Sequence, residues 1–92
     1  MVLVMNTKAI TDVCRAVGGQ AKLYELIHVT SANVYQWCKG IRPVPAKYCP
    51  SIESVAAEFG CPVTRRDLRP DDWWLIWPEL VTDEFPVPRK VA

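Results

Sequence analysis

Apolar residues recur at helical spacing in the first part of the chain. The first run follows the i, i+3, i+4, i+7 pattern of a helix with one buried face, and its members are Ile10, Val13, Cys14 and Val17. Because Asn6 or Thr7 can cap a helix at this point, we expect the helix to continue to about Val17. The pair Gly18-Gly19 predicts that the helix ends there and that the chain reverses sharply.

Residues 20–40 predict two further short helices joined by a tight bend. Both have apolar residues at i, i+3 and i+4, which are Leu23, Leu26 and Ile27 in the first helix and Val34, Trp37 and Cys38 in the second. Thr30 is a good N-cap for the second helix, and Gly40 tolerates the left-handed backbone that ends a helix. Two short helices crossing over a bend at residues 28–30 predict a helix-turn-helix.

The outward side of the second helix, residues 30–39, is polar and lacks carboxylates. Its members are Ser31, Ala32, Asn33, Tyr35, Gln36 and Lys39. Small side chains and hydrogen-bonding groups suit a helix that enters the major groove of DNA, where an acidic group would face phosphate. This pattern makes residues 30–39 the candidate recognition helix.

The chain after residue 40 predicts a stiff connector and one longer helix. Pro43 and Pro45 exclude a helix from residues 41–45. A fourth helix then starts at Pro45 or Pro50, because proline is accepted in a first turn, and ends near Phe59-Gly60. Its expected buried face consists of Ile52, Val55, Ala56 and Phe59.

A cluster of tryptophans follows a predicted short helix that starts at Thr64, where Thr64 and Asp67 have capping-box spacing. Trp73, Trp74 and Trp77 form either a lid over the core or a surface for self-association or a protein partner, and both interpretations stay open. Prolines in residues 82–92 predict a loose tail, which leaves residues 1–81 as the folded domain. The apolar run at residues 2–4 fits a strand, packing under the first helix, or fraying.

Charged residues are distributed unevenly along the chain. The net charge is +1, but residues 1–66 carry eight Lys and Arg against four Asp and Glu, and residues 67–92 carry three against six. A basic body (+4) with an acidic C-terminal segment (−3) fits a nucleic-acid-binding module whose last segment does not touch the nucleic acid. The apolar fraction of 50% indicates a globular chain, and its length indicates one domain.

The residue types that support catalysis or metal binding do not form a recognisable set. The four cysteines are 24, 11 and 12 positions apart and His28 is the one histidine, so we expect no zinc site and thiols that behave as small apolar groups. We expect no enzyme and no cofactor, because no nucleophile–base set or glycine-rich phosphate loop is present. Without a signal-peptide pattern or an apolar run of about 20 residues, we expect a cytoplasmic protein.

Two longer segments, GGQAKLYELIHVTSANVYQWCKGIRPVPAKYCPSIE and VTRRDLRPDDW, resemble the Cro-like, YdaS-type regulators of prophages and some bacterial operons. The resemblance covers about residues 7–77. It implies an all-α, compact, lambda-repressor-like helix-turn-helix domain of about five short helices. It also implies binding to double-stranded operator DNA, usually as a homodimer, and some members are antitoxin-like partners in toxin–antitoxin modules.

Residue by residue, the resemblance implies base contacts by Thr30, Ser31, Ala32, Tyr35 and Gln36. Phosphate contacts are expected from polar and basic residues around them, namely Gln20, Lys22, Asn33, Lys39 and Arg42. Gln20 and Lys22 flank a helix start that is either a phosphate clamp or simply solvated, and Arg42 is either a phosphate contact or an ordinary surface residue. Two positions depart from the family pattern: Tyr24 replaces a small residue at the helix crossing, and His28 replaces a glycine in the bend.

The sequence therefore predicts a sequence-specific DNA-binding repressor or regulator of a prophage or toxin–antitoxin operon. A homodimer would contact two half-sites about one helical turn apart. The alternative is a protein–protein interaction module that uses Trp73, Trp74 and Trp77 without specific DNA binding.

Overall fold

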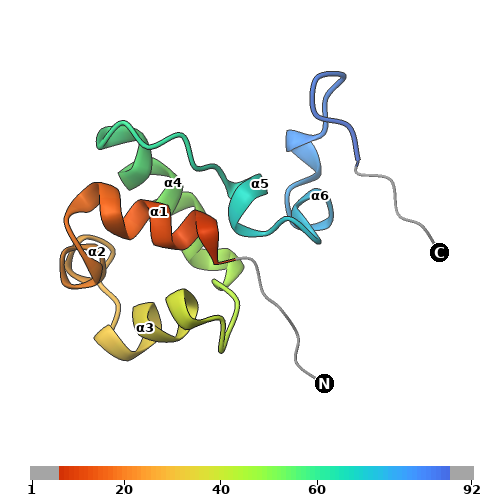
Figure 1. Ribbon diagram of the computed structural model, residues 1–92. Helices are drawn as coiled ribbons and strands as arrows, with labels where there is room; N and C mark the ends of the chain where they lie inside the picture. The colour runs from red at the N-terminus through yellow and green to blue at the C-terminus, as the bar shows by residue number, and fades with distance from the viewer. Residues whose placement is uncertain (1–6, 88–92) are drawn as a thin grey trace.

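The computed structural model describes residues 7–87, and these residues are helical without any β-strand (Figure 1). The elements in chain order are α1 (Lys8–Val17), α2 (Gln20–Leu26), α3 (Ser31–Lys39), the 3₁₀ helix η1 (Ala46–Tyr48), α4 (Cys49–Glu58), α5 (Arg65–Leu68), α6 (Trp73–Ile76) and the 3₁₀ helix η2 (Pro78–Leu80). The predicted all-α fold is confirmed, and the tryptophan segment adds a sixth α-helix to the five expected. The run at residues 2–4 lies outside the described residues, so the interpretations given for it stay open.

Helix α1 buries the face that the sequence predicts, because Ile10, Val13, Cys14 and Val17 are all buried. Thr7 precedes the first turn. Its backbone carbonyl accepts the N–H of Thr11 at 3.0 Å, and its side chain makes no capping hydrogen bond. The helix ends at Gly18 with φ of 107°, in the left-handed region. Gly19 follows with φ of 129° and donates its N–H to the carbonyl of Cys14 at 2.7 Å. Two residues that adopt positive φ thus produce the reversal into α2.

The bend between α2 and α3 is closed by backbone and capping contacts. His28 has φ of 60°, and the next N–H, from Val29, is donated to the carbonyl of Tyr24 at 3.1 Å. Thr30 accepts the N–H of Asn33 on its hydroxyl oxygen at 3.3 Å, which confirms it as the N-cap of α3. Tyr24 is half-buried and packs against the core, so the ring is accommodated at the helix crossing. The predicted helix-turn-helix is present.

Helix α4 begins after a separate 3₁₀ turn, with Pro50 in its first turn. Ile52 and Ala56 are fully buried, but Phe59 is 43% exposed, so the prediction that Phe59 belongs to the buried face is wrong. The helix ends at Glu58, and Phe59 leaves helical geometry with φ of −99° and ψ of 12°. Since helical periodicity stops there, the side chain of Phe59 no longer continues the buried face.

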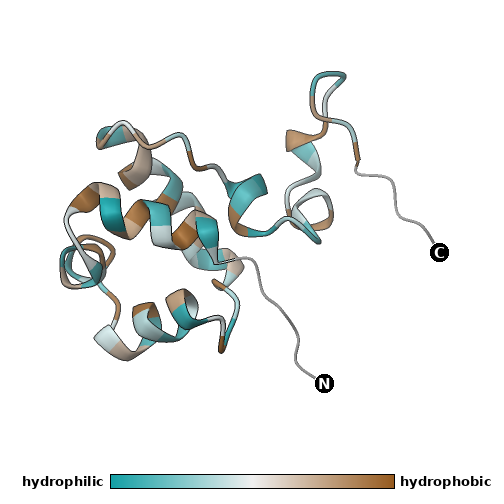
Figure 2. Cartoon of the chain, in the orientation of Figure 1, coloured by the Kyte–Doolittle hydropathy of each residue, from teal (hydrophilic) through white to brown (hydrophobic). Residues whose placement is uncertain are grey.

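The core lies where α1 meets its neighbours, because α1 contacts α2, α3, α4 and α5 (Figure 1). Figure 2 shows brown apolar and teal polar segments alternating along α1, as expected for a helix with one buried face. The largest fully buried side chains come from four of these helices and are Leu23, Ile52, Val13, Val34 and Cys49.

Two of the three clustered tryptophans belong to this core. Trp73 is 4% exposed and Trp77 is 9% exposed, whereas Trp74 is half-buried and meets Trp73 edge-on at 5.8 Å between ring centroids. The lid interpretation is therefore correct for Trp73 and Trp77. Of the three rings only Trp74 is partly exposed, so a partner surface at this segment would not include the rings of Trp73 and Trp77, and the partner interpretation itself stays open.

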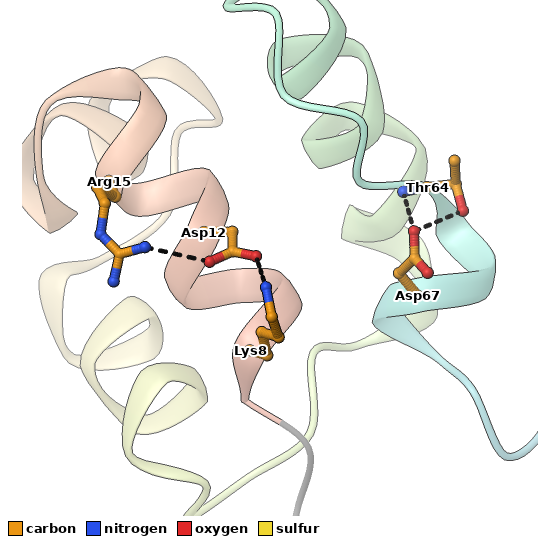
Figure 3. A network of polar contacts seen from close by, with 5 residues as sticks. All are labelled: Lys8, Asp12, Arg15, Thr64 and Asp67. Carbon is orange, nitrogen blue, oxygen red and sulfur yellow. Dashed lines mark hydrogen bonds and ion pairs between the residues drawn. The ribbon is translucent and has the colours of Figure 1, made fainter.

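Helix α5 is fixed at its start by polar contacts. The carboxylate of Asp67 accepts the N–H of Thr64 at 2.9 Å and its hydroxyl at 3.0 Å, as the capping-box spacing predicts (Figure 3). Glu53 of α4 accepts the N–H of Arg65 at 3.2 Å and pairs with its guanidinium at 3.1 Å.

On the adjacent α1, Asp12 pairs with Lys8 at 2.6 Å and with Arg15 at 3.3 Å (Figure 3).

The chain after η2 folds back on α5. Thr82 donates its N–H to the carbonyl of Phe85, and its hydroxyl accepts the N–H of Phe85, both at 3.0 Å. The guanidinium carbon of Arg66 lies 3.5 Å from the ring centroid of Phe85. Residues 82–85 thus form a closed turn, while the division of the chain at residue 81 stays a prediction. In residues 7–87 no helix has the length and apolar character needed to cross a membrane.

Candidate nucleic-acid interface

Helix α3 is held against the body of the protein by its inner side. Val34 is fully buried and Trp37 is 4% exposed, and the ring of Trp37 lies 5.7 Å from that of Tyr48 on η1. Gly40, with φ of 75°, ends the helix. Since one side of α3 is fixed in this way, its other side is presented to solvent in a single orientation.

The outer side of α3 has the exposure that the sequence predicts for most of its members. Five of the expected contact residues are exposed, namely Thr30, Ser31, Ala32, Tyr35 and Lys39, and two are half-buried, namely Asn33 and Gln36. No Asp or Glu lies in Ser31–Lys39. The amine of Lys39 lies 5.7 Å from the ring centroid of Tyr35 one turn earlier, which adds positive charge to this surface.

A hollow of about 580 Å³ opens beside α3. It is lined by residues of α3 and of the following connector, which are Asn33, Gln36, Trp37, Arg42, Pro43 and Pro45. The backbone carbonyl of Gln36 accepts the N–H of Ile41 at 3.0 Å and that of Arg42 at 3.4 Å. The connector is thereby fixed to the end of α3, and the exposed Arg42 is brought next to two polar side chains of the helix.

The start of α2 presents Gln20 and Lys22 to solvent, and α2 contacts α3. The two residues therefore belong to the same helix pair as the outer side of α3, but they do not line the hollow. Their assignment to phosphate contact stays a prediction.

One basic residue near this surface was not selected from the sequence. Lys47 on η1 is exposed, and its amine lies 5.2 Å from the ring centroid of Tyr48, which itself packs on Trp37. Its position directly after the Pro43–Pro45 connector was the available signal. Only the fold, which places η1 against α3 through these rings, reveals its proximity to the candidate interface.

Three groups with a shifted pKa lie on α1 or in the core, not on the outer side of α3. The hydrogen bond from Lys8 lowers the pKa of Asp12 on α1. Burial, and then the neighbouring thiol of Cys38, raises the pKa of Cys14. Burial raises the pKa of Cys49 to about 11. Its thiol donates a hydrogen bond to the carbonyl of Pro45, with 3.5 Å between sulfur and oxygen. A thiol with such a pKa is protonated at neutral pH and is a weak nucleophile.

Comparison with known proteins finds a family and a relative that match most of the chain. The family model described as "Bacterial toxin YdaS" matches residues 10–76. A curated Escherichia coli (strain K12) protein named "Putative transcriptional regulator YdaS" is 44% identical over 62 residues, which are 65% of this chain and 59% of that protein. The chain thus spans somewhat less than two thirds of the length of this relative. No solved structure matches with significance.

The matched segment begins in α1 and ends with α6, so it includes the helix-turn-helix, the connector and the buried Trp73. The names of the family and of the relative differ, since one names a toxin and the other a transcriptional regulator. The extent of the match nevertheless shows that the chain belongs to the YdaS family.

Proposed function

We propose that the protein binds double-stranded DNA sequence-specifically, with α3 in the major groove, and acts as a transcriptional repressor. The observation that carries the proposal is the two-sided character of α3: its inner side is anchored by Val34 and Trp37, and its outer side is exposed, polar and free of carboxylates. A helix of this kind meets the geometric and electrostatic requirements of groove binding.

In this proposal, base edges are contacted from the start and middle of α3. Gln36 forms a bidentate pair with an adenine, Thr30 and Ser31 reach bases or phosphates, and Tyr35 lies along a thymine methyl or the sugar wall. Because the hydroxyl oxygen of Thr30 accepts the N–H of Asn33, its own hydrogen is available to donate. Ala32 is small enough to allow close approach.

Phosphate contacts fix the register of the helix on the duplex. Arg42 and Asn33 line the hollow beside α3, so both are suitably placed to contact one phosphate group. Lys39, Lys22 and Gln20 serve the flanking phosphates. A homodimer contacting two half-sites about one helical turn apart, and occupying a promoter, completes the proposed mechanism of repression.

The name of the Escherichia coli relative also describes a transcriptional regulator. The family description as a toxin supports a second candidate, in which the chain acts through a protein partner. That partner would bind the surface of α6, where Leu75 is 73% exposed next to the half-buried Trp74.

The proposal is tested by fluorescence-anisotropy titration of the full chain with labelled DNA from its own upstream region and with a scrambled duplex. The test variant is Ala32→Glu, and the matched control is Ala57→Glu, since both alanines are exposed on helices. A carboxylate on α3 would face phosphate, so we expect Ala32→Glu to weaken binding at least about tenfold. Ala57→Glu, on α4, is expected to bind like the original protein.

Tighter binding to the upstream DNA than to the scrambled duplex, with a steep decrease in affinity as salt rises, is the supporting result. Equal weak binding to both duplexes, unchanged by Ala32→Glu, would reject specific DNA binding. The surface around Leu75 would then be tested for a protein partner.

A further inference from the structure

Two cysteines that are 24 positions apart in sequence meet where α1 packs on α3. The sulfur atoms of Cys14 on α1 and Cys38 on α3 lie 3.5 Å apart, and both are free thiols. Cys14 is 5% exposed, whereas Cys38 is half-buried, so one member of the pair is within reach of a small solute. The other two cysteines are not part of this contact: Cys49 has the Pro45 carbonyl as partner.

The two sulfurs lie at contact distance, which is longer than a bond. A disulfide has an S–S length of about 2.05 Å, so the two sulfurs would have to approach by about 1.5 Å, through rotation of the two side chains and displacement of the helices. The helices already contact each other, so no element has to unfold. Proximity of this kind favours intramolecular bond formation over reaction with another molecule.

We propose that Cys14 and Cys38 form an oxidation site, at which hydrogen peroxide converts the thiol pair to an intramolecular disulfide between α1 and α3. In the first step Cys38 loses its proton to water, its thiolate attacks one peroxide oxygen and the O–O bond breaks, which forms Cys38 sulfenic acid and hydroxide; the hydroxide takes up the released proton and becomes water. In the second step the sulfur of Cys14 attacks the sulfenic sulfur, loses its proton and displaces water. Overall, two thiols and one peroxide give one disulfide and two waters.

The order of the steps follows from the surroundings of the two thiols. Burial raises the pKa of Cys14, which keeps this thiol protonated until a sulfenic acid is in contact with it. Cys38 is the more exposed of the two and is therefore the one that meets peroxide.

The bond affects the candidate recognition helix directly, and this consequence rests on the proposed function. Cys38 lies two residues after Gln36 on α3, and the core around it is closely packed, so part of the approach is taken up by displacement of α3. A bidentate base contact is sensitive to displacements well below 1 Å. The oxidised protein is therefore expected to bind specific DNA at least about tenfold more weakly than the reduced protein, a loss of about 1.4 kcal/mol.

Disulfide formation is tested on the full chain without DNA. After treatment with hydrogen peroxide, the intact mass should fall by about 2 Da, and trypsin should release residues 9–15 linked to residues 23–39. Cys38→Ala should abolish the link, and the control Cys49→Ala/Cys61→Ala, which keeps the pair, should retain it. A disulfide between other cysteines, or stepwise gain of oxygen at Cys38 without a link, would overturn the proposal.

The regulatory consequence is tested by anisotropy with the same DNA before oxidation, after oxidation and after reduction with dithiothreitol. The expected result is a loss of affinity that the reductant restores and that Cys38→Ala does not show. An oxidised, linked protein with unchanged affinity would reject the coupling to α3. Absence of specific binding by the reduced protein would reject the proposed function, while the peptide mapping still decides on the disulfide.

Discussion

Gln36 combines a structural and a proposed recognition role in one residue. Its backbone carbonyl holds the connector, and its half-buried side chain lines the hollow beside α3. Because only the side chain is removed in Gln36→Ala, the fold should be kept while specific binding weakens by about 1–3 kcal/mol, the value of one bidentate base contact. Anisotropy with the upstream duplex measures the change.

The matched control for this prediction is Ser54→Ala, which also shortens a side chain on a helix but at an exposed position of α4. It should leave affinity unchanged. If Gln36→Ala alters affinity by no more than a few tenths of a kcal/mol, Gln36 does not contact a base.

Cys49 gives the protein a predictable response to alkaline pH. Its side chain is fully buried, and burial raises its pKa from 9.0 to about 11. The folded state therefore holds the proton over a range in which the unfolded state loses it, so stability is complete below pH 9 and declines as pH rises towards 11. We expect roughly 1–2 kcal/mol to be lost over this range.

Urea denaturation at pH 7.5 and pH 10.5 measures this decline. In Cys49→Ala the difference between the two pH values should shrink, although the variant is less stable at both. Cys61→Ala, at a half-buried position, is the control and should keep the full difference. An identical decline in all three proteins would assign it to other groups.

At the scale of elements, the bend between α2 and α3 depends on a residue with left-handed backbone. His28 has φ of 60°, where a residue without Cβ is not strained. We expect His28→Gly to leave stability unchanged or raise it by up to about 1 kcal/mol, and His28→Val to lower it by roughly 1–2 kcal/mol, because β-branched residues are outliers there. Thermal denaturation of the three proteins checks the order; a more stable valine variant would contradict it.

Arg69 connects the C-terminal elements to the connector behind α3. Its guanidinium binds the carboxylate of Asp72 at 2.6 and 3.1 Å and donates to the carbonyl of Val44 at 2.9 Å. Asp72 also raises the pKa of Arg69, so the cation is present throughout the usual pH range. We expect Arg69→Ala to cost about 1.5–3 kcal/mol in urea denaturation, since a half-buried carbonyl and carboxylate lose a charged donor.

Two variants sharpen this prediction. Arg69→Lys should recover only part of the loss, because an ammonium cannot form the two-pronged contact. Arg15→Ala removes an exposed ion pair with Asp12 and should leave the free energy of unfolding nearly unchanged. Equal losses for Arg69→Ala and Arg15→Ala would show that the link to Val44 contributes nothing.

For the whole molecule, charge separates the helical body from the C-terminal segment. Residues 1–66 have a net charge of +4 and residues 67–92 a net charge of −3. If the body alone faces DNA, Lys39→Gln should reduce the slope of log affinity against log salt by roughly one counterion. Lys8→Gln should leave the slope unchanged, because Lys8 is already paired with Asp12.

The fold was largely predictable because local signals agree with burial. The α1 face, the Thr30 cap, the Gly40 end and the bend at residues 28–30 follow from spacing and backbone preference, which act within one or two turns. The candidate interface was predictable in part. The hollow shared by Asn33, Gln36 and Arg42, and the nearby Lys47, depend on how the connector packs on α3.

The sequence by itself determined the end of α1, the start and end of α3, and that the outer side of α3 carries no carboxylate. Tertiary structure decided the contacts between distant positions. It buried Trp73 and Trp77, exposed Phe59, and brought Cys14 within 3.5 Å of Cys38. The physical reason is that periodicity specifies which side of a helix is apolar, whereas the partner of that side depends on packing between elements that a local pattern does not contain.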